Sequence, residues 1–272
     1  MDKTRLVLGI EYDGSNFSGW QRQNNQRSVQ QVVEQALSKV ANHSVIVQCA
    51  GRTDSGVHAL EQVIHFDVTI ERELHAWILG GNSNLPDDVR ITWVKEAVGD
   101  FHARYSAIAR FYRYIILNRP IKSALLREQV TWCHAPLDVE KMHEAAQYLI
   151  GKHDFSSFRA QGCQSKSPFR AMHFIDVYRQ GDNVIIDISA NAFLHHMVRN
   201  IAGVLMAIGS EKQPVAWTQE LLDVKSRKLG GITAPPDGLY LGAVYYPEHY
   251  GISKHPIFAK LPIDAKRHDE ST

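Results

Sequence analysis

The spacing of apolar residues in the first hundred positions predicts alternating strands and helices. Residues 5–13 alternate around aliphatic side chains and predict a strand, whereas the polar, glycine-containing residues 14–27 predict a loop. Ser28 is a candidate N-cap with Gln31 as its capping-box partner, and it opens a helix. The apolar face of that helix consists of Val29, Val32, Val33, Ala36, Leu37 and Val40.

The remainder of this half predicts strands at 44–50, 60–68 and 89–98, with a helix at 71–80 before the last of them. The resulting order, β-α-β-β-α-β, is that of a split βαβ unit. Residues 85–88 (LPDD) supply the turn that precedes the last strand.

The second half repeats this alternation without repeating the sequence. The pattern predicts strands at 109–118, 172–179, 183–190 and 238–246, and helices at 137–151, 192–209 and 215–225. The helix at 137–151 should end at Gly151, and the turn Gly181-Asp182 should join two paired strands. We therefore expect an α+β protein with one mixed, largely antiparallel sheet. Its two halves are residues 1–108 and 109–249, followed by a loosely held tail at 250–272.

Composition narrows the class of protein. Of the 272 residues, 44% are hydrophobic and 22% charged, which is ordinary for a folded globular chain and excludes a disordered or fibrous one. No run of about 20 apolar residues is present, so we expect no membrane contact and a cytoplasmic location. The three cysteines are far apart and form no C-x-x-C pair, which predicts reduced thiols.

Basic residues gather in blocks, although the net charge is only +1. Residues 61–100 carry eight acids and three bases, whereas residues 101–120 carry four arginines and no acid. Basic blocks that also contain aromatics suit contact with RNA phosphates and bases. The alternative is a core of aromatics beneath ordinary surface charge. The candidate RNA-binding residues are Arg22, Arg104, Arg110, Lys152, Arg159, Lys166 and Arg170.

Common catalytic motifs are missing. The chain has no phosphate-binding glycine motif, so no nucleotide cofactor is expected, and it has neither G-x-S-x-G nor H-E-x-x-H. Most histidines, including His58, His65 and His102, are expected to pack, cap or contact solvent. His195 and His196 are expected on the helix at 192–209, where adjacent side chains point about 100° apart and chelate poorly. We therefore expect no metal site.

The loop GRTDSGVHA (51–59) is the strongest candidate for chemistry. Its glycines permit a sharp turn and close approach to a ligand, which would expose Asp54 between two strands. Arg52 stands two positions away. Asp54 is either the acceptor of an Asx-turn or a carboxylate held in a cleft, ionised and usable as a nucleophile.

Seven segments in series, including that loop, resemble the TruA family of tRNA pseudouridine synthases. They are YDGSNFSGWQRQ (12–23), SVQQVVEQAL (28–37), GRTDSGVHA (51–59), LPDDVRITWVKEAVGDFHARYSAIARFYRYII (85–116), GKHDFSSFR (151–159), NAFLHHMVRNIAG (191–203) and GLYLGAVYYP (238–247). The resemblance implies a pseudouridine-synthase fold of two ferredoxin-like halves with a central cleft. It also implies a homodimer that binds the anticodon stem-loop of tRNA and isomerises uridines 38, 39 and 40 without cofactor or metal.

Four residues acquire roles from this resemblance. Asp54 would be the catalytic aspartate, Tyr112 the tyrosine beside the target base, Arg199 the pocket arginine paired with the aspartate, and Arg52 an aid to base extrusion. Arg199 also lies within an apolar stretch, where an unpaired charge is costly, so a carboxylate partner is expected. Without the resemblance, Tyr112 would be a sheet aromatic.

Two other functions compete with the isomerase. One is a non-catalytic RNA-binding module, although ARFYRYII (109–116) does not match the aromatic motif of an RNA-recognition strand. The other is a nucleoside hydrolase, which would need two carboxylates flanking the glycosidic bond. No second carboxylate is evident beside Asp54 in the sequence.

Overall fold

The computed structural model describes residues 3–252, which form one sheet covered by helices. The strand order is β4-β1-β3-β10-β5-β9-β8-β7, with β2 paired to β3 and β6 to β5. The strands are β1 (Thr4–Tyr12), β2 (Gln48–Cys49), β3 (His58–Val68), β4 (Val89–Glu96), β5 (Ala109–Asn118), β6 (Thr131–Cys133), β7 (Gly151–Asp154), β8 (Phe169–Gln180), β9 (Asn183–Ala190) and β10 (Leu239–Tyr245).

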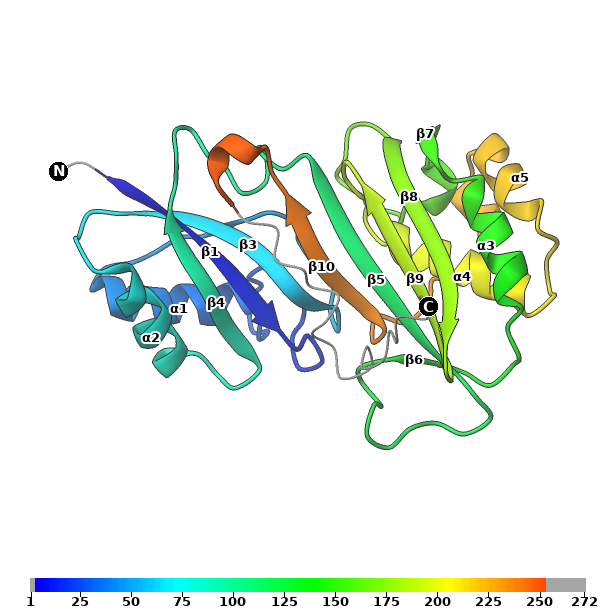
Figure 1. Cartoon of the computed structure of the whole chain (residues 1–272), viewed down its shortest axis with the longest axis horizontal. Coiled ribbons are helices and arrows are strands. Elements are labelled where there is room, and N and C mark those ends of the chain that lie inside the picture. Colours follow the sequence, from blue (N-terminus) through cyan, green and yellow to red (C-terminus); the bar gives the residue numbers. More distant parts are fainter. Residues whose placement is uncertain (1–2, 253–272) are drawn as a thin grey trace, which may run out of the picture.

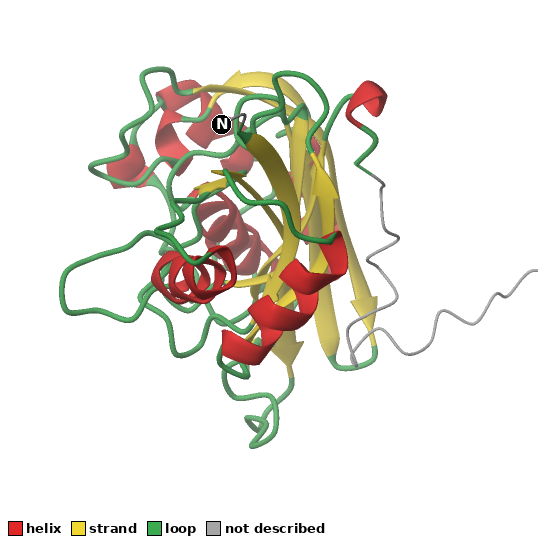
Figure 2. Cartoon of the chain, turned by 90° about the vertical axis from the view of Figure 1, so that its left-hand side faces the viewer, coloured by secondary structure: helices red, strands yellow, loops and turns green. Residues whose placement is uncertain are grey.

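The α-helices gather on one face of this sheet (Figure 2). The first half contributes α1 (Val29–Ala41) and α2 (Leu74–Asn84), and the second contributes α3 (Val139–Gln147), α4 (Met197–Gly209) and α5 (Trp217–Val224). Single 3-10 turns lie at η1 (Ser156–Phe158), η2 (Arg227–Leu229) and η3 (Glu248–Tyr250).

Each half has the ferredoxin-like topology. In the first half, β4, β1, β3 and β2 are adjacent in that order, and in the second half β10, β5, β9 and β8 are arranged in the same way. The predicted α+β class and the mixed, largely antiparallel sheet are therefore confirmed. The predicted boundary at 108/109 falls between β4 and β5.

The last strand joins the halves. β10 pairs with β5 in antiparallel fashion and with β3 in parallel, through Tyr240 opposite His58 and Leu241 opposite Ala59. Figure 1 shows β10 in the middle of the sheet, between the N-terminal and C-terminal halves. The closing strand of the sequence is thus central in space, and the loops beside it come from both halves.

β5 shows why this region forms a strand buried on both faces. Tyr112, Tyr114 and Ile116 face the main core, whereas Phe111 and Ile115 pack in separate clusters. Alternating side chains point to opposite faces of a strand, so both faces of β5 are covered. Its bounds are those predicted from the sequence.

Several expected elements differ from the structure at their ends, including the helix expected at 71–80, which is Leu74–Asn84. The predicted strand 44–50 is reduced to the two residues of β2. The helix predicted at 137–151 covers only α3, and Gly151 (φ +101°) begins β7 instead of capping the helix. The helix predicted from residue 192 starts at Met197. Of the predicted tail 250–272, residues 253–272 lie outside the described part.

The predicted capping box before α1 is wrong. Ser28 has an extended backbone, as an N-cap should, but its buried hydroxyl makes no hydrogen bond. Instead, the backbone N–H groups of Val29 and Gln30 donate to the carbonyls of Gly19 and Trp20, at 3.2 and 3.0 Å. The loop before the helix therefore satisfies its first donors, and this loop also contacts Asp54's loop.

Candidate active site

Asp54 lies in the loop between β2 and β3, and hydrogen bonds to the sheet hold the residues just before it. Gln62, on β3, binds both backbone groups of Gly51: it accepts from the N–H at 3.2 Å and donates to the carbonyl. The Thr53 hydroxyl hydrogen-bonds the Tyr12 hydroxyl at 2.7 Å. Because these partners belong to the central strands, the position of Asp54 is fixed by the sheet.

The loop at residues 14–20 packs against the other side of Asp54's loop. The Trp20 N–H donates to the Thr53 carbonyl at 3.0 Å. A Cβ added at Gly14 would stand 2.0 Å from the Val57 carbonyl oxygen, and one at Gly19 (φ +87°) would stand 2.7 Å from the Thr53 carbonyl oxygen. Glycine is therefore required at both positions for the two loops to approach this closely.

Arg199 reaches Asp54 from the second half, on the first turn of α4. Its Nη1 donates to Asp54 Oδ2 at 3.3 Å, and its Nε donates to the carbonyl of Ala234 at 2.8 Å. The side chain of Arg199 is 14% exposed and that of Asp54 is 22% exposed. The expected carboxylate partner of Arg199 is therefore Asp54, across 145 positions of sequence.

Tyr112 lies on β5 beside the same loop. Its ring meets that of Phe193 edge-on, with centroids 5.1 Å apart, and a Cβ added at Gly51 would lie 3.8 Å from its hydroxyl. Burial, reinforced by the negative charge of Asp54, raises the pKa of Tyr112 well above its usual range. The side chain is therefore a neutral phenol at physiological pH, and it has no hydrogen-bond partner among residues 3–252.

Arg52 is exposed at the rim of the same loop. Burial raises the pKa of the Cys49 thiol to about 12, and the charges of Arg52 and Arg104 oppose that rise. Both cations therefore lie near the end of β2. Within the described part of the chain, the Arg52 guanidinium has no ion pair, so it is available to a ligand.

His195 and His196 are the site residues that sequence reasoning missed. The expected helical placement is wrong: both precede α4, and His196 has a left-handed backbone (φ +59°) that turns the chain. The centroids of their rings lie 3.9 Å apart. His195 Nε2 lies 3.3 Å from Asp54 Oδ1, and His196 Nε2 lies 3.3 Å from Asp54 Oδ2. Burial lowers the pKa of His196, although Asp54 opposes this, so its imidazole is neutral at physiological pH. These three side chains could hold a metal ion.

The three histidines singled out from the sequence, His58, His65 and His102, behave as expected. His58 accepts from the Gly14 N–H at 3.0 Å, His65 accepts from the Ala103 N–H at 3.1 Å, and His102 accepts from the N–H groups of its own turn. These imidazoles therefore hold backbone N–H groups in place. The three cysteines are free, as predicted.

The seven candidate RNA-binding residues fall into distinct environments. Lys152, Lys166 and Arg104 are exposed. Arg110 is buried, and its guanidinium donates to the carbonyls of Arg104, Ala107, Asn191 and Ala50, which leaves little of it for a phosphate. It braces the loop that precedes Asp54.

Arg159 and Arg170 shape the loop between β7 and β8, residues 155–168. Arg159 donates to the carbonyls of Cys163 and Ser165, and Arg170 donates to the hydroxyl of Ser165 at 2.7 Å. The Ala160 N–H donates to the His195 carbonyl at 3.0 Å. This basic loop is therefore continuous with the surroundings of Asp54.

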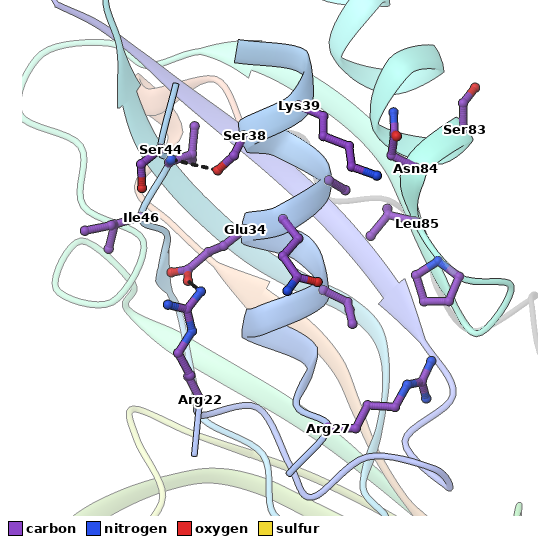
Figure 3. Close-up of a pocket in the computed structure, with 15 residues that line it drawn as sticks. Arg22, Arg27, Glu34, Ser38, Lys39, Ser44, Ile46, Ser83, Asn84 and Leu85 are labelled. Carbon is purple, nitrogen blue, oxygen red and sulfur yellow. Dashed lines mark hydrogen bonds and ion pairs between the residues drawn. The ribbon is translucent and has the colours of Figure 1, made fainter. Parts of the chain in front are cut away.

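The remaining candidate, Arg22, lies apart from Asp54. It lines a cavity of about 830 Å³ beside α1, where it forms an ion pair with buried Glu34 (Figure 3). None of Asp54, Tyr112 and Arg199 lines this cavity. Arg22 thus belongs to a separate part of the surface.

Known proteins resemble this chain over nearly its whole length. A family model described as tRNA pseudouridine synthase matches residues 9–106 and 145–247. The tRNA pseudouridine synthase A of Methylococcus capsulatus is 62% identical over 98% of this chain and 100% of its own length. That of Nitrosococcus oceani is 59% identical, over 92% of this chain and 96% of its own.

Among solved structures, a Cbf5-Nop10-Gar1 complex resembles this chain. It is 11% identical with a TM-score of 0.30, and the match covers 74% of this chain and 54% of that one.

Within residues 3–252, the helices are all too short or too polar to span a bilayer.

Proposed function

Because this chain belongs to the tRNA pseudouridine synthase family, we propose that it isomerises uridines 38, 39 and 40 in the anticodon stem-loop, with Asp54 as the nucleophile. The observation that carries this proposal is the meeting of Asp54 from one half with Arg199 from the other, beside Tyr112. The reaction breaks the N1–C1′ bond, turns the uracil and forms the C5–C1′ bond. The C5 proton is lost and N1 gains one, so no oxidant or group donor is consumed.

Each site residue has a role in this proposal. Asp54 attacks C6 of the ring or C1′ of the ribose, or supports elimination to a glycal, and all three routes use one carboxylate. Arg199 holds that carboxylate in place through its hydrogen bond to Oδ2. Tyr112 offers its ring face to the uracil, and its phenol contributes a hydroxyl where the C5 proton must leave.

The surroundings of Asp54 favour an isomerase over a glycoside hydrolase. In the described part of the chain, the side chains within 4 Å of the Asp54 carboxylate oxygens in these contacts are Arg199, His195 and His196, and none of them carries a carboxyl group. A hydrolase would need a second carboxyl group on the other side of the bond. A single carboxyl group suits a reaction in which the uracil stays in the pocket until the new bond forms.

Arg52 and the exposed cations support substrate binding in the same proposal. A uridine in a stem must leave its stack, which costs a few kcal/mol. Arg104 and Arg52, at the end of β2, together with Lys152 and Lys166, would recover that energy through phosphate contacts and recognise the RNA by shape.

The test uses tRNA labelled with tritium at uracil C5. The wild-type chain should release tritium to water while the RNA stays intact, because the C5 proton is lost when C5 bonds to C1′. Asp54→Asn should lower this rate by at least about 10⁴-fold, since removing a nucleophile removes the covalent route. The matched control is Asp182→Asn, in the exposed turn between β8 and β9, which should keep the wild-type rate.

Three results would contradict parts of the proposal. Wild-type release by Asp54→Asn would remove Asp54 from the nucleophile role. Release of free uracil would indicate a hydrolase, and tight tRNA binding with no release by the wild type would indicate a binding module. Repeating the assay with uridine kept at only one of positions 38, 39 and 40 tests the proposed targets.

We also propose, from the family resemblance, that the chain forms a homodimer. We propose further that this dimer acts on tRNA in the cytoplasm. Light scattering of the purified chain should give about twice the 30.7 kDa chain mass. A mass of one chain at the concentration of the tritium assay would contradict the dimer and leave the chemistry unaffected.

A further inference from the structure

We propose that Asp54, His195 and His196 form a binding site for Zn²⁺, and that Zn²⁺ bound there inhibits the isomerisation. The proposed binding of Zn²⁺ rests only on the positions of these three side chains. The inhibition rests on the proposed role of Asp54, because an ion held by this carboxylate would keep it from uridine.

The spacing of the three side chains fits tetrahedral coordination. His195 Nε2 and His196 Nε2 each lie 3.3 Å from an Asp54 carboxylate oxygen, and the ligand atoms of all three residues lie within 4.8 Å of one another. Zinc bonds of about 2.0–2.2 Å at tetrahedral angles separate neighbouring ligands by roughly 3.3–3.5 Å. The two histidine contacts end on different oxygens of Asp54, so a zinc ion would draw the three ligand atoms together by roughly 1 Å to reach this spacing.

The backbone holds both histidines in this pose. His196 is fixed in a left-handed conformation immediately before α4. The carbonyl of His195 accepts from the Ala160 N–H at 3.0 Å, and its N–H points to the Cys163 sulfur at 3.5 Å. Convergence of the two rings on Asp54 thus follows from the turn and from the loop between β7 and β8.

The site is open to solvent and incomplete in its ligands. The side chains of His195, His196 and Asp54 are 46%, 29% and 22% exposed, so an ion can enter directly. Three protein ligands leave a fourth position for water, an arrangement typical of open zinc sites and not of structural ones. Imidazole and carboxylate together suit Zn²⁺ better than Mg²⁺ or Ca²⁺, which prefer oxygen ligands alone.

Arg199 limits how tightly the ion binds. Its Nη1 lies 3.3 Å from Asp54 Oδ2, so a cation at this site competes with the guanidinium for the same carboxylate. The bound ion is therefore reversible and is not a resident cofactor. Bound zinc would replace the contact between Arg199 and Asp54 that holds the carboxylate in place.

Direct binding is tested with Co²⁺, which reports tetrahedral coordination by its visible absorption and which Zn²⁺ should displace. The full chain is first freed of metal with a chelator. Loss of one ligand should weaken binding at least about 10-fold, so His195→Ala, His196→Ala and Asp54→Asn should each do so. His75→Ala is the matched control, because His75 is an exposed histidine on α2, and it should bind as the wild type does.

The inhibition is tested by tritium release, with each variant compared to its own metal-free rate. Zinc should inhibit the wild type and His75→Ala equally, and a chelator should restore both. His195→Ala and His196→Ala should need at least about 10-fold more zinc for half inhibition. Circular dichroism and thermal unfolding show that the variants are folded.

The outcomes separate the two claims. Unchanged Co²⁺ affinity in all three variants would overturn the site and would mean that the histidines only hydrogen-bond to Asp54. Equal zinc inhibition across variants would place the inhibition on the RNA or elsewhere on the protein. Active Asp54→Asn would refute the nucleophile while the Co²⁺ titration still tests the site.

Discussion

At the scale of single residues, Arg199 fixes the geometry around Asp54. Its Nε and Nη1 bind two different partners, the Ala234 carbonyl and the Asp54 carboxylate. The Ala234 N–H returns a hydrogen bond to the Arg199 carbonyl at 3.1 Å. A planar guanidinium presents donors on separate nitrogens, which suits these two partners better than the single ammonium of a lysine does.

We expect Arg199→Ala to lower turnover more than tRNA affinity. Misplacing a catalytic group by about 1 Å can cost 10²-fold in rate, and removing its guanidinium partner frees Asp54 to move. Single-turnover tritium release and filter binding measure the two effects separately. Arg199→Lys should fall between the wild type and Arg199→Ala in turnover. Loss of affinity with normal single-turnover rate would make Arg199 an RNA-docking residue.

A second residue, His65, makes stability depend on pH. Burial, together with the charges of His102 and Arg5, lowers its pKa to about 4. Its Nδ1 accepts from the Ala103 N–H, which requires the neutral ring. Between pH 6.5 and 4 the unfolded chain binds this proton and the folded chain does not, so stability is full above pH 6.5 and falls as the pH falls.

We expect this imidazole to cost the wild type about 2 kcal/mol in free energy of unfolding between pH 7 and pH 5. His65→Asn keeps an acceptor near the Ala103 N–H and cannot titrate in this range. Its loss over the same interval should be smaller by that amount. Urea unfolding at the two pH values measures both, and equal losses in the two proteins would contradict the role of His65.

At the scale of elements, α4 brings Arg199 close to the segment at residues 230–234. Gly203, one turn after Arg199, permits that contact: a Cβ there would stand 1.8 Å from the Ile232 carbonyl oxygen. Because Ala234 lies two residues after Ile232, the approach at Gly203 also sets the carbonyl that holds Arg199. The helix and the segment thus form one support for the site.

We expect Gly203→Ala to destabilise the protein by about 1–3 kcal/mol and to lower turnover, because the added methyl group forces the segment outward. Gly99→Ala is the control. Gly99 has φ +61° and nothing within 4 Å of the added Cβ, so alanine there costs about 1 kcal/mol of backbone strain away from Asp54. Thermal unfolding should respond to both variants, and tritium release only to Gly203→Ala. Normal release by Gly203→Ala would show that the segment does not support Arg199.

At the scale of the whole molecule, charge is distributed unevenly over a nearly neutral chain. The exposed cations Arg104, Lys152 and Lys166 belong to segments that border Asp54's loop or the loop between β7 and β8. Local positive charge, not the net charge of +1, governs attraction of a polyanion.

We expect tRNA affinity to fall steeply as salt rises, and Lys166→Ala to reduce the slope of log affinity against log salt by about 1. Lys3→Ala, at the start of the first strand, is the control and should keep the wild-type slope. Fluorescence anisotropy with labelled stem-loop RNA at several salt concentrations measures these slopes. An unchanged slope in Lys166→Ala would exclude its phosphate contact.

Local sequence predicted much of the fold because the signals concerned are short-range. The strand at 109–118 and the pair at 172–190 have alternating apolar residues, and alternation depends only on neighbours in the chain. The position of β10 between β3 and β5 follows from long-range pairing, which periodicity does not encode. The failed cap at Ser28 has the same cause, since Gly19 and Trp20 supply its substitute through a loop contact.

By itself, the sequence determined the secondary-structure alternation, the α+β class, the family and the pairing of Arg199 with a carboxylate, because these depend on residue types and short spacings. Only the tertiary structure decided that His195 and His196 leave the helix and converge on Asp54. That arrangement depends on one left-handed residue and on a contact with Ala160. Neither leaves a periodic pattern along the chain, because both arise where segments distant in sequence pack together.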